Sequence, residues 1–185
     1  MVRPFLACGL LLTLSLASYG DDKPGANLST PPSNAAKIRG ETMTGTTITP
    51  YLFFGGRCAE ALEFYRKSLG AEIDRVMRYD ESPQPPPPGF LAVGFEKKIM
   101  HASFRVRGVP LMAADGLDDK SKSDGVWLVL TLPTEAECRR AFDALADGGI
   151  VQMPLTKTFN SPCFGMLTDR FGLGWMVTVP QAPAN

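Results

Sequence analysis

His101 is the only histidine in the sequence, and its neighbours indicate what chemistry it could do. The segment IMHASFRV (99–106) alternates between apolar and polar residues, which predicts a strand with His101, Ser103 and Arg105 on one face. If a tight turn returns the chain along VPLMAAD, Ser103 faces Met112 in the resulting hairpin. Such a cluster could orient an anionic or carbonyl ligand, with His101 as acid or base near neutral pH. We favour the alternative, a hydrogen-bonded imidazole beside a solvated arginine, because no second titratable partner for His101 can be named.

Large apolar residues on other strand segments form a second set of candidates. Met112, Met166, Trp175 and Met176 could line a pocket for an apolar or aromatic ligand, or could simply be core. The candidate ligand-binding residues are therefore His101, Ser103, Arg105, Met112, Trp127, Trp175 and Met176.

The cysteines do not form a recognisable site. Without Cys8, which lies in the N-terminal apolar run, the chain keeps Cys58, Cys138 and Cys163. Their spacing matches neither a zinc ribbon nor a CxxC redox motif, so we expect small buried hydrophobic residues. An odd number leaves at least one thiol unpaired in an oxidising compartment.

The elements that must position these residues follow a repeated pattern. A β-rich run, ITPYLFFGG, precedes apolar residues at helical spacing over 58–69, and Gly70 ends that helix. The strand segments AEIDRVMRY, IMHASFRV and VPLMAAD come next, and the first two are separated by the Pro-rich run 83–88, which forbids regular structure.

The same order then begins again. VWLVLTL is a strand, Thr134 and Glu137 predict a capping box, and the helix after them closes at Gly148-Gly149. IVQMPL, FGMLT and WMVTV are three further strands, with a turn at 169–172 between the last two. A duplicated unit is the simplest explanation, since neither half could bury its helix and sheet alone.

The N-terminal segments indicate where the domain begins in the sequence and where the protein is located, and the net charge indicates what it does not bind. Residues 1–20, with Arg3 before an apolar run and small residues after it, predict a signal peptide; an uncleaved tether is the alternative. Residues 21–46 predict a disordered linker, and residues 47–180 the domain, with halves at 47–115 and 124–180. We expect export to the periplasm or beyond, and no membrane contact after cleavage. A net charge of zero argues against nucleic-acid binding.

These segments resemble a known family. TPYLFFGGRCAEALEFYRKSLGA, KIMHASF, PLMAAD, FDALADGG, VQMPL and FGMLTDRFGLGWMV are similar to the PhnB-like branch of the vicinal oxygen chelate (glyoxalase/bleomycin-resistance) superfamily, over residues 49–179. The resemblance implies an α+β fold of two βαβββ modules that form a cupped mixed sheet with helices outside, and commonly a homodimer. The segment GFLAVGFE looks longer than in relatives and is either a lid over the cavity or, as we favour, a surface excursion.

The resemblance also identifies where a metal would bind. Metalloenzymes of the superfamily place His, Gln or Glu on the first and fourth strands of each half. The matching positions are Pro50, Met112, Val126 or Trp127, and Met176. None supplies a donor for a hard divalent ion, so we expect no metal and no other cofactor.

Two classes of function remain open. The first is a non-enzymatic protein that binds a small molecule in a metal-free cavity, as bleomycin-resistance relatives do. The second is a glyoxalase-like enzyme that acts on a small carbonyl substrate. It would be either metal-independent or metal-dependent through ligands at positions other than the four given above. A cavity filled by side chains in a dimeric scaffold is a further possibility. Some members of this branch are labelled as methyltransferases, but the sequence has no G-x-G nucleotide-binding turn to support that label.

Overall fold

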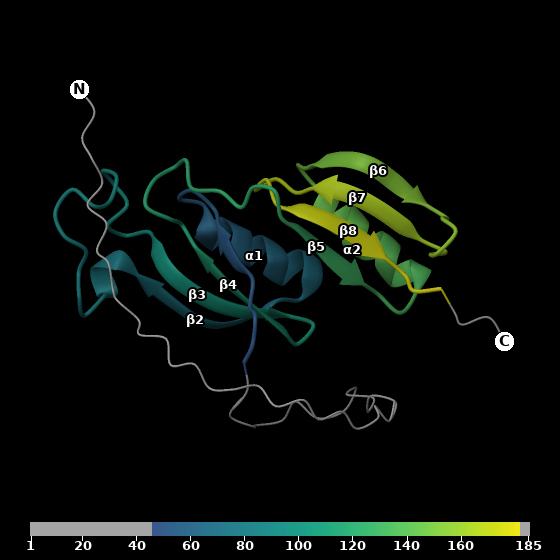
Figure 1. The fold of residues 1–185 in the computed structure, drawn as a ribbon, viewed down its shortest axis with the longest axis horizontal. Helices are drawn as coiled ribbons and strands as arrows, with labels where there is room; N and C mark the ends of the chain where they lie inside the picture. The colour runs from purple at the N-terminus through teal and green to yellow at the C-terminus, as the bar shows by residue number, and fades with distance from the viewer. Residues whose placement is uncertain (1–45, 182–185) are drawn as a thin grey trace, which may run out of the picture. The chain divides into compact units, whose positions relative to one another are not determined.

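The computed structural model describes residues 46–181, which form two four-stranded sheets and two α-helices (Figure 1). The first half contains β1 (Tyr51–Phe53), α1 (Cys58–Leu69), β2 (Glu72–Arg78), β3 (Ile99–Val106) and β4 (Val109–Ala114), with a 3-10 turn at Tyr79–Glu81. The second half contains β5 (Trp127–Thr131), α2 (Glu135–Ala146), β6 (Ile150–Thr156), β7 (Phe164–Thr168) and β8 (Gly174–Thr178). The order of one strand, one helix and three strands occurs twice, which confirms the α+β class and the predicted duplication.

The predicted signal peptide and nearly all of the predicted linker lie outside the described residues. Neither described helix has the length and apolar character needed to cross a bilayer.

Both sheets have the same topology. The strand orders are β1-β4-β3-β2 and β5-β8-β7-β6; the pairs β1–β4 and β5–β8 are parallel, and the other pairs are antiparallel. Ser103 pairs with Met112 across the β3–β4 hairpin, as the sequence predicted. The turn of that hairpin is Arg107-Gly108, whose φ angles of 50° and 82° are the positive values that a type I′ turn requires.

The helix ends agree with the sequence except in one detail. Gly70 ends α1 with a φ of 69°, and the Thr134 hydroxyl accepts a hydrogen bond from the Glu137 backbone N–H at 3.2 Å at the start of α2. The predicted capping box is only half formed, because the Glu137 carboxylate instead accepts a 2.9 Å hydrogen bond from the Arg107 guanidinium. A charged donor is a stronger partner than a backbone N–H, and Arg107 comes from the first half.

The core lies between the two sheets and contains both helices. Buried residues of both halves form one continuous hydrophobic cluster. Tyr65 of α1 shows how closely the halves are joined: its ring stacks on Phe104 of β3 at a centroid distance of 6.3 Å and meets Trp175 of β8 edge-on at 5.8 Å. One face of each sheet is therefore covered by helices.

The opposite face of each sheet is open, and the two open faces lie on opposite sides of the helix layer. On the first sheet the open face carries Tyr51, Met112, Ser103 and Arg75, which follow one another in register across all four strands. On the second it carries Val129, Met176, Met166 and Met153 in the corresponding row. Within one chain, the expected cup is thus present as two separate walls.

The segment between β2 and β3 has no strand or helix beyond the 3-10 turn. The C-terminal end of this segment nevertheless packs against the domain. Phe95 is buried, and the backbone N–H of Asp80 donates to the Glu96 carbonyl at 2.9 Å. This packing agrees with a surface excursion held against the domain.

Candidate functional site

The polar centre of the first open face is a hydrogen-bonded pair of Tyr51 and His101. The Tyr51 hydroxyl lies 3.1 Å from His101 Nδ1 and 3.3 Å from the Met100 carbonyl oxygen, to which it can donate. The two rings are tilted by 40° with centroids 5.7 Å apart. β1 supplies the tyrosine and β3 the histidine, so the β1–β4–β3 pairing brings them together across β4.

Tyr51 remains protonated over the ordinary pH range. Burial raises the pKa of its hydroxyl, and the nearby Tyr79 and Cys58 raise it further. The hydroxyl is therefore a neutral hydrogen-bond donor, and the His101 ring adds a group that can both donate and accept. Such a pair can fix the orientation of a carbonyl or carboxylate oxygen.

Tyr51 is the site residue that the sequence reasoning missed. From the sequence, no titratable partner for His101 could be named. The signal that could have found it is the parallel β1–β4 pairing, which sets Tyr51 opposite Met112 and hence beside the His101 strand.

Arg105 lies on the same open face, but its charge is already paired. One terminal nitrogen, Nη2, lies 2.7 Å from an Asp74 carboxylate oxygen and 3.0 Å from one of Glu72. Both pairs are partly exposed, so each contributes modestly to stability. The Arg105 Nε is buried and has no hydrogen-bond partner within the described residues. The guanidinium is thus engaged with β2 rather than directed at the Tyr51–His101 pair.

A cavity of about 390 Å³ opens beside this pair. Its wall is aromatic and aliphatic, and a lysine and a serine stand on the loop that follows β4; the lining includes Tyr51, Phe53, Tyr79, Met100, Leu117, Ser121 and Lys122. Tyr79 is held in place because its hydroxyl donates to the Gly116 carbonyl at 3.0 Å. Lys122 pairs with Asp124 at 2.7 Å in an exposed ion pair that a ligand could replace at little cost.

The open face of the second sheet is apolar. Trp127, Val129 and Met153 are 37%, 61% and 39% exposed, and Met176 lies beside Val129 in the same row. The Trp127 indole lies flat over Gly174, where an added Cβ would come within 2.5 Å of the ring. Six of the seven predicted ligand-binding residues are therefore on open faces: His101, Ser103, Arg105 and Met112 on the first sheet, and Trp127 and Met176 on the second.

The expectation for Trp175 needs correction. Its side chain points to the helices, is 3% exposed, and donates its indole N–H to Asp169 at 2.9 Å. Because strand residues alternate between faces, Met176 on the open face requires Trp175 on the covered one.

The positions at which superfamily metalloenzymes carry ligands do not fit a metal here. Met112, Trp127 and Met176 are on the open faces, and Pro50 directly precedes β1, where its carbonyl accepts a hydrogen bond from the Met112 N–H. Proline and tryptophan offer no ligating side-chain atom, and a thioether is a poor ligand for a hard divalent ion. Across residues 46–181, no three His, Cys, Asp or Glu side chains gather in a way that could hold an ion.

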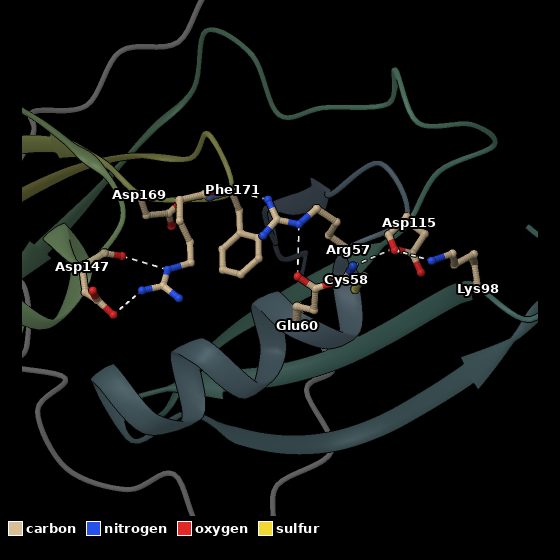
Figure 2. A network of polar contacts seen from close by, with 10 residues as sticks. Arg57, Cys58, Glu60, Lys98, Asp115, Asp147, Asp169 and Phe171 are labelled. Atoms are coloured by element: carbon tan, nitrogen blue, oxygen red, sulfur yellow. Dashed lines mark hydrogen bonds and ion pairs between the residues drawn. The ribbon is translucent and has the colours of Figure 1, made fainter.

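A second polar network connects the two halves on the helix side (Figure 2). The Arg57 guanidinium stacks over the Phe171 ring at 4.6 Å, and its Nη1 donates to the Arg170 carbonyl at 3.2 Å. Arg170 in turn pairs with Asp147 and stacks over Phe64. A cavity of about 530 Å³ lies beside these residues, but its charged side chains are largely engaged with one another. We interpret this network as structural.

Two buried aspartates anchor the ends of that network. Asp115 accepts hydrogen bonds of 2.6 Å from the backbone N–H groups of Cys58 and Ile99, which joins the start of α1 to β3. Asp169 accepts four: from the Tyr65 hydroxyl at 2.7 Å, from Trp175, and from two backbone N–H groups of its own turn. Both carboxylates are buried and bonded to N–H or O–H groups of the fold itself, so we assign them a structural role.

The three cysteines within the described residues are buried, as expected. Burial raises the pKa of Cys58 to about 12, with a smaller contribution from Asp115, and burial and contact with Cys163 raise that of Cys138 to about 12. A thiolate is the reactive form, so neither Cys58 nor Cys138 is a nucleophile at neutral pH.

The sequence of this chain is similar to known proteins. A family model described as 3-demethylubiquinone-9 3-methyltransferase matches residues 46–178. Protein YjdN of Escherichia coli is 34% identical over 140 residues, which are 71% of this chain and 94% of that protein.

Solved structures of similar proteins also cover this domain. Protein PA1353 from Pseudomonas aeruginosa is 39% identical with a TM-score of 0.65, over 75% of this chain and 100% of that one. The PhnB protein from Bacillus cereus is 31% identical with a TM-score of 0.60, over 72% and 99%. The fosfomycin resistance protein FosX from Listeria monocytogenes, at 10% identity and a TM-score of 0.51 over 76% and 93%, is similar in fold alone.

Proposed function

Since this chain belongs to the PhnB-like family of the vicinal oxygen chelate superfamily, we propose that it binds a small molecule, without a metal, between the open faces of two copies. The methyltransferase description is only the name of the family model. The proposal has two parts, the dimer and the ligand, and each has its own test.

The exposure of the second sheet's open face carries the proposal. Val129, Trp127 and Met153 form an apolar surface on the face of the second sheet that no helix covers. Exposed apolar patches of this kind usually mark an interface or a binding site. The first sheet of the same chain cannot cover that patch, because the helix layer lies between the two sheets. The first sheet of a second copy can, and twofold symmetry then covers both open faces at once.

The opposite characters of the two faces define the ligand class. The first face offers the Tyr51–His101 pair and the aromatic cavity beside it, whereas the second offers Trp127 and methionines. The matching ligand is a small aromatic or conjugated molecule with a carbonyl or carboxylate oxygen. Its oxygen accepts from the Tyr51–His101 pair, and its apolar body lies against the second sheet of the partner.

The dimer is tested by placing a charge on the apolar face. Val129→Glu should give a monomer by light scattering at tens of micromolar, because it would bury a carboxylate without a partner. Val93→Glu is the matched control, since Val93 is 99% exposed on the loop before β3, and this variant should stay dimeric. A monomeric wild type, or a dimeric Val129→Glu, would contradict the proposal.

The ligand is tested by a thermal-shift screen of aromatic carboxylates and aldehydes on the full chain, because a ligand that binds only the folded state raises its melting temperature. Tyr51→Phe removes one hydrogen bond from the site and should weaken the best ligand roughly tenfold. Ser68→Ala is the control, since it removes a hydroxyl on α1 that donates to the Phe64 carbonyl away from this cavity, and it should bind as wild type. If no compound stabilises the protein, or if Tyr51→Phe binds equally well, the ligand assignment fails.

A metal-independent enzyme is the second candidate, and the hydrogen bond between Tyr51 and His101 favours it. In that case His101 moves a proton to or from a bound carbonyl compound, and Tyr51 holds the imidazole in place. His101→Ala should then abolish turnover of a small carbonyl substrate, while His101→Ala in a pure binding protein changes affinity alone. Metal content of the purified protein, followed by chelation, tests the metal-dependent version of this candidate.

We also propose that the chain is exported, on the basis of the apolar run and small residues within positions 1–20. Cell fractionation together with N-terminal sequencing of the mature protein tests this. Recovery of the intact chain from the cytoplasm would overturn it.

A further inference from the structure

We propose that Cys138 and Cys163 form a disulfide when the chain folds in an oxidising environment, and that this bond ties α2 to the strand β7. The two thiols lie in the second half, 25 residues apart in the sequence. The Cys138 Sγ lies 3.7 Å from the Cys163 carbonyl oxygen, to which its S–H can donate, and the Cys163 thiol is near enough to raise the pKa of Cys138. Both residues are almost completely buried, so the thiols meet in the core and not at a surface.

The surrounding hydrogen bonds leave the pair free to react. The Cys163 carbonyl already accepts from the Val179 N–H at 3.0 Å and from the Ser161 hydroxyl at 2.8 Å. Loss of the Cys138 S–H donor therefore leaves no buried acceptor without a partner.

The third buried cysteine provides an internal comparison. Cys58 starts α1 in the first half, and its backbone N–H is bonded to Asp115. It is as deeply buried as Cys138, but among residues 46–181 no second thiol contributes to its raised pKa. A bond between Cys138 and Cys163 thus leaves one free thiol in the domain, as the odd number of cysteines requires.

The reaction is a two-electron oxidation. The two thiols lose two protons and two electrons, one S–S bond forms, and an external disulfide such as oxidised glutathione or the disulfide of an oxidoreductase is reduced to two thiols. The thiolate is the attacking species, and the burial that raises the pKa of Cys138 keeps it scarce in the folded domain. The bond consequently forms while the chain is folding, and the finished core then protects it from reduction.

The expected consequence is a more stable second half. Closing a loop of this length removes conformational freedom from the unfolded chain, and for a domain of this size the melting temperature should rise by roughly 10 °C. The bond joins α2 to the start of β7, so the gain depends on an unstrained fit between helix and sheet.

The test uses the full chain, unfolded in denaturant with reductant and refolded in a glutathione redox buffer. Remaining thiols are alkylated after denaturation, and the peptides are mapped by mass spectrometry, Cys8 included. We expect one linked peptide pair, Cys138 with Cys163, in wild type and in Cys58→Ala, and no link in Cys138→Ala. Reductant should lower the melting temperature of the first two proteins and leave that of Cys138→Ala unchanged.

The peptide map of the wild type decides the question without any variant. Alkylation of all four cysteines after refolding in oxidised glutathione overturns the proposal. A link that involves Cys58, or a glutathione adduct on Cys138 in place of the link, overturns it as well.

Discussion

Replacing Asp169 by asparagine should destabilise the domain more than any other isosteric change to a carboxylate within residues 46–181. The side chain is 3% exposed, and its two oxygens accept four hydrogen bonds. One oxygen serves the Tyr65 hydroxyl and the Trp175 indole, and the other serves two backbone N–H groups of the β7–β8 turn. An amide keeps the shape but replaces one oxygen by an NH2 donor, which then faces two other donors.

The magnitude follows from that count. Two hydrogen bonds to a charged acceptor, at about 1.5–3 kcal/mol each, are lost. The gain from no longer burying a charge offsets part of this, because an ionised carboxylate is costly to remove from water. We therefore expect a net loss of about 2–4 kcal/mol in the free energy of unfolding, and a fall in melting temperature on the order of 10 °C.

The assay is denaturant unfolding followed by circular dichroism, with Asp147→Asn as the matched control. Asp147 lies beside the same turn and pairs with Arg170, but its carboxylate is 75% exposed, so the control should change stability by less than about 0.5 kcal/mol. Tyr65→Phe completes a double-mutant cycle in which the two losses should be less than additive. Equal effects of Asp169→Asn and Asp147→Asn, or full additivity in the cycle, would refute the reasoning.

Three further predictions test other parts of the structure. Burial raises the pKa of Cys58 from 9.0 to about 12, so the protonated thiol contributes about 4 kcal/mol to the free energy of unfolding. This contribution is complete below pH 9 and is lost as the pH rises toward 12. Denaturation midpoints should therefore fall between pH 9 and 12, and should fall less steeply in Cys58→Ala. Gly165→Ala would place a Cβ 2.6 Å from the Phe142 ring, and overpacking should lower the free energy of unfolding by about 1–3 kcal/mol; an unchanged denaturation midpoint would contradict this. Gly174→Ala should lift the Trp127 indole from the sheet, which a red shift of tryptophan emission would report and an identical spectrum would exclude.

The fold could be predicted because its local signals agree with one another. Alternation in IMHASFRV, helical spacing over 58–69 and Gly70 each identify an element, and the two halves repeat the same order. The register of the β3–β4 hairpin followed from its two-residue turn. Such signals depend on residues close together in the sequence, so a single sequence is enough to find them.

The parts that were missed depend on contacts between distant residues. Tyr51 and His101 are 50 residues apart in the sequence, and they meet only through the parallel β1–β4 pairing, which no local pattern specifies. Glu137 was predicted to close its own helix cap, but Arg107 from the other half competes for it. Trp175 was grouped with Met176 as a pocket candidate, with the core as the alternative; it lies in the core, because neighbouring strand residues face opposite ways. The side of each sheet that the helices cover became clear only from the packing of Tyr65 against both sheets.

The contact of Tyr65 with Asp169 has a practical consequence for dividing the protein. The halves are joined in sequence by the loop from Gly116 to Asp124, whereas their cores are one cluster. A gene cut within that loop would yield two polypeptides, each left with an open apolar surface that its counterpart fits. Produced together, they should reassemble into a working domain, which makes the loop a natural point for split-reporter fusions or for circular permutation.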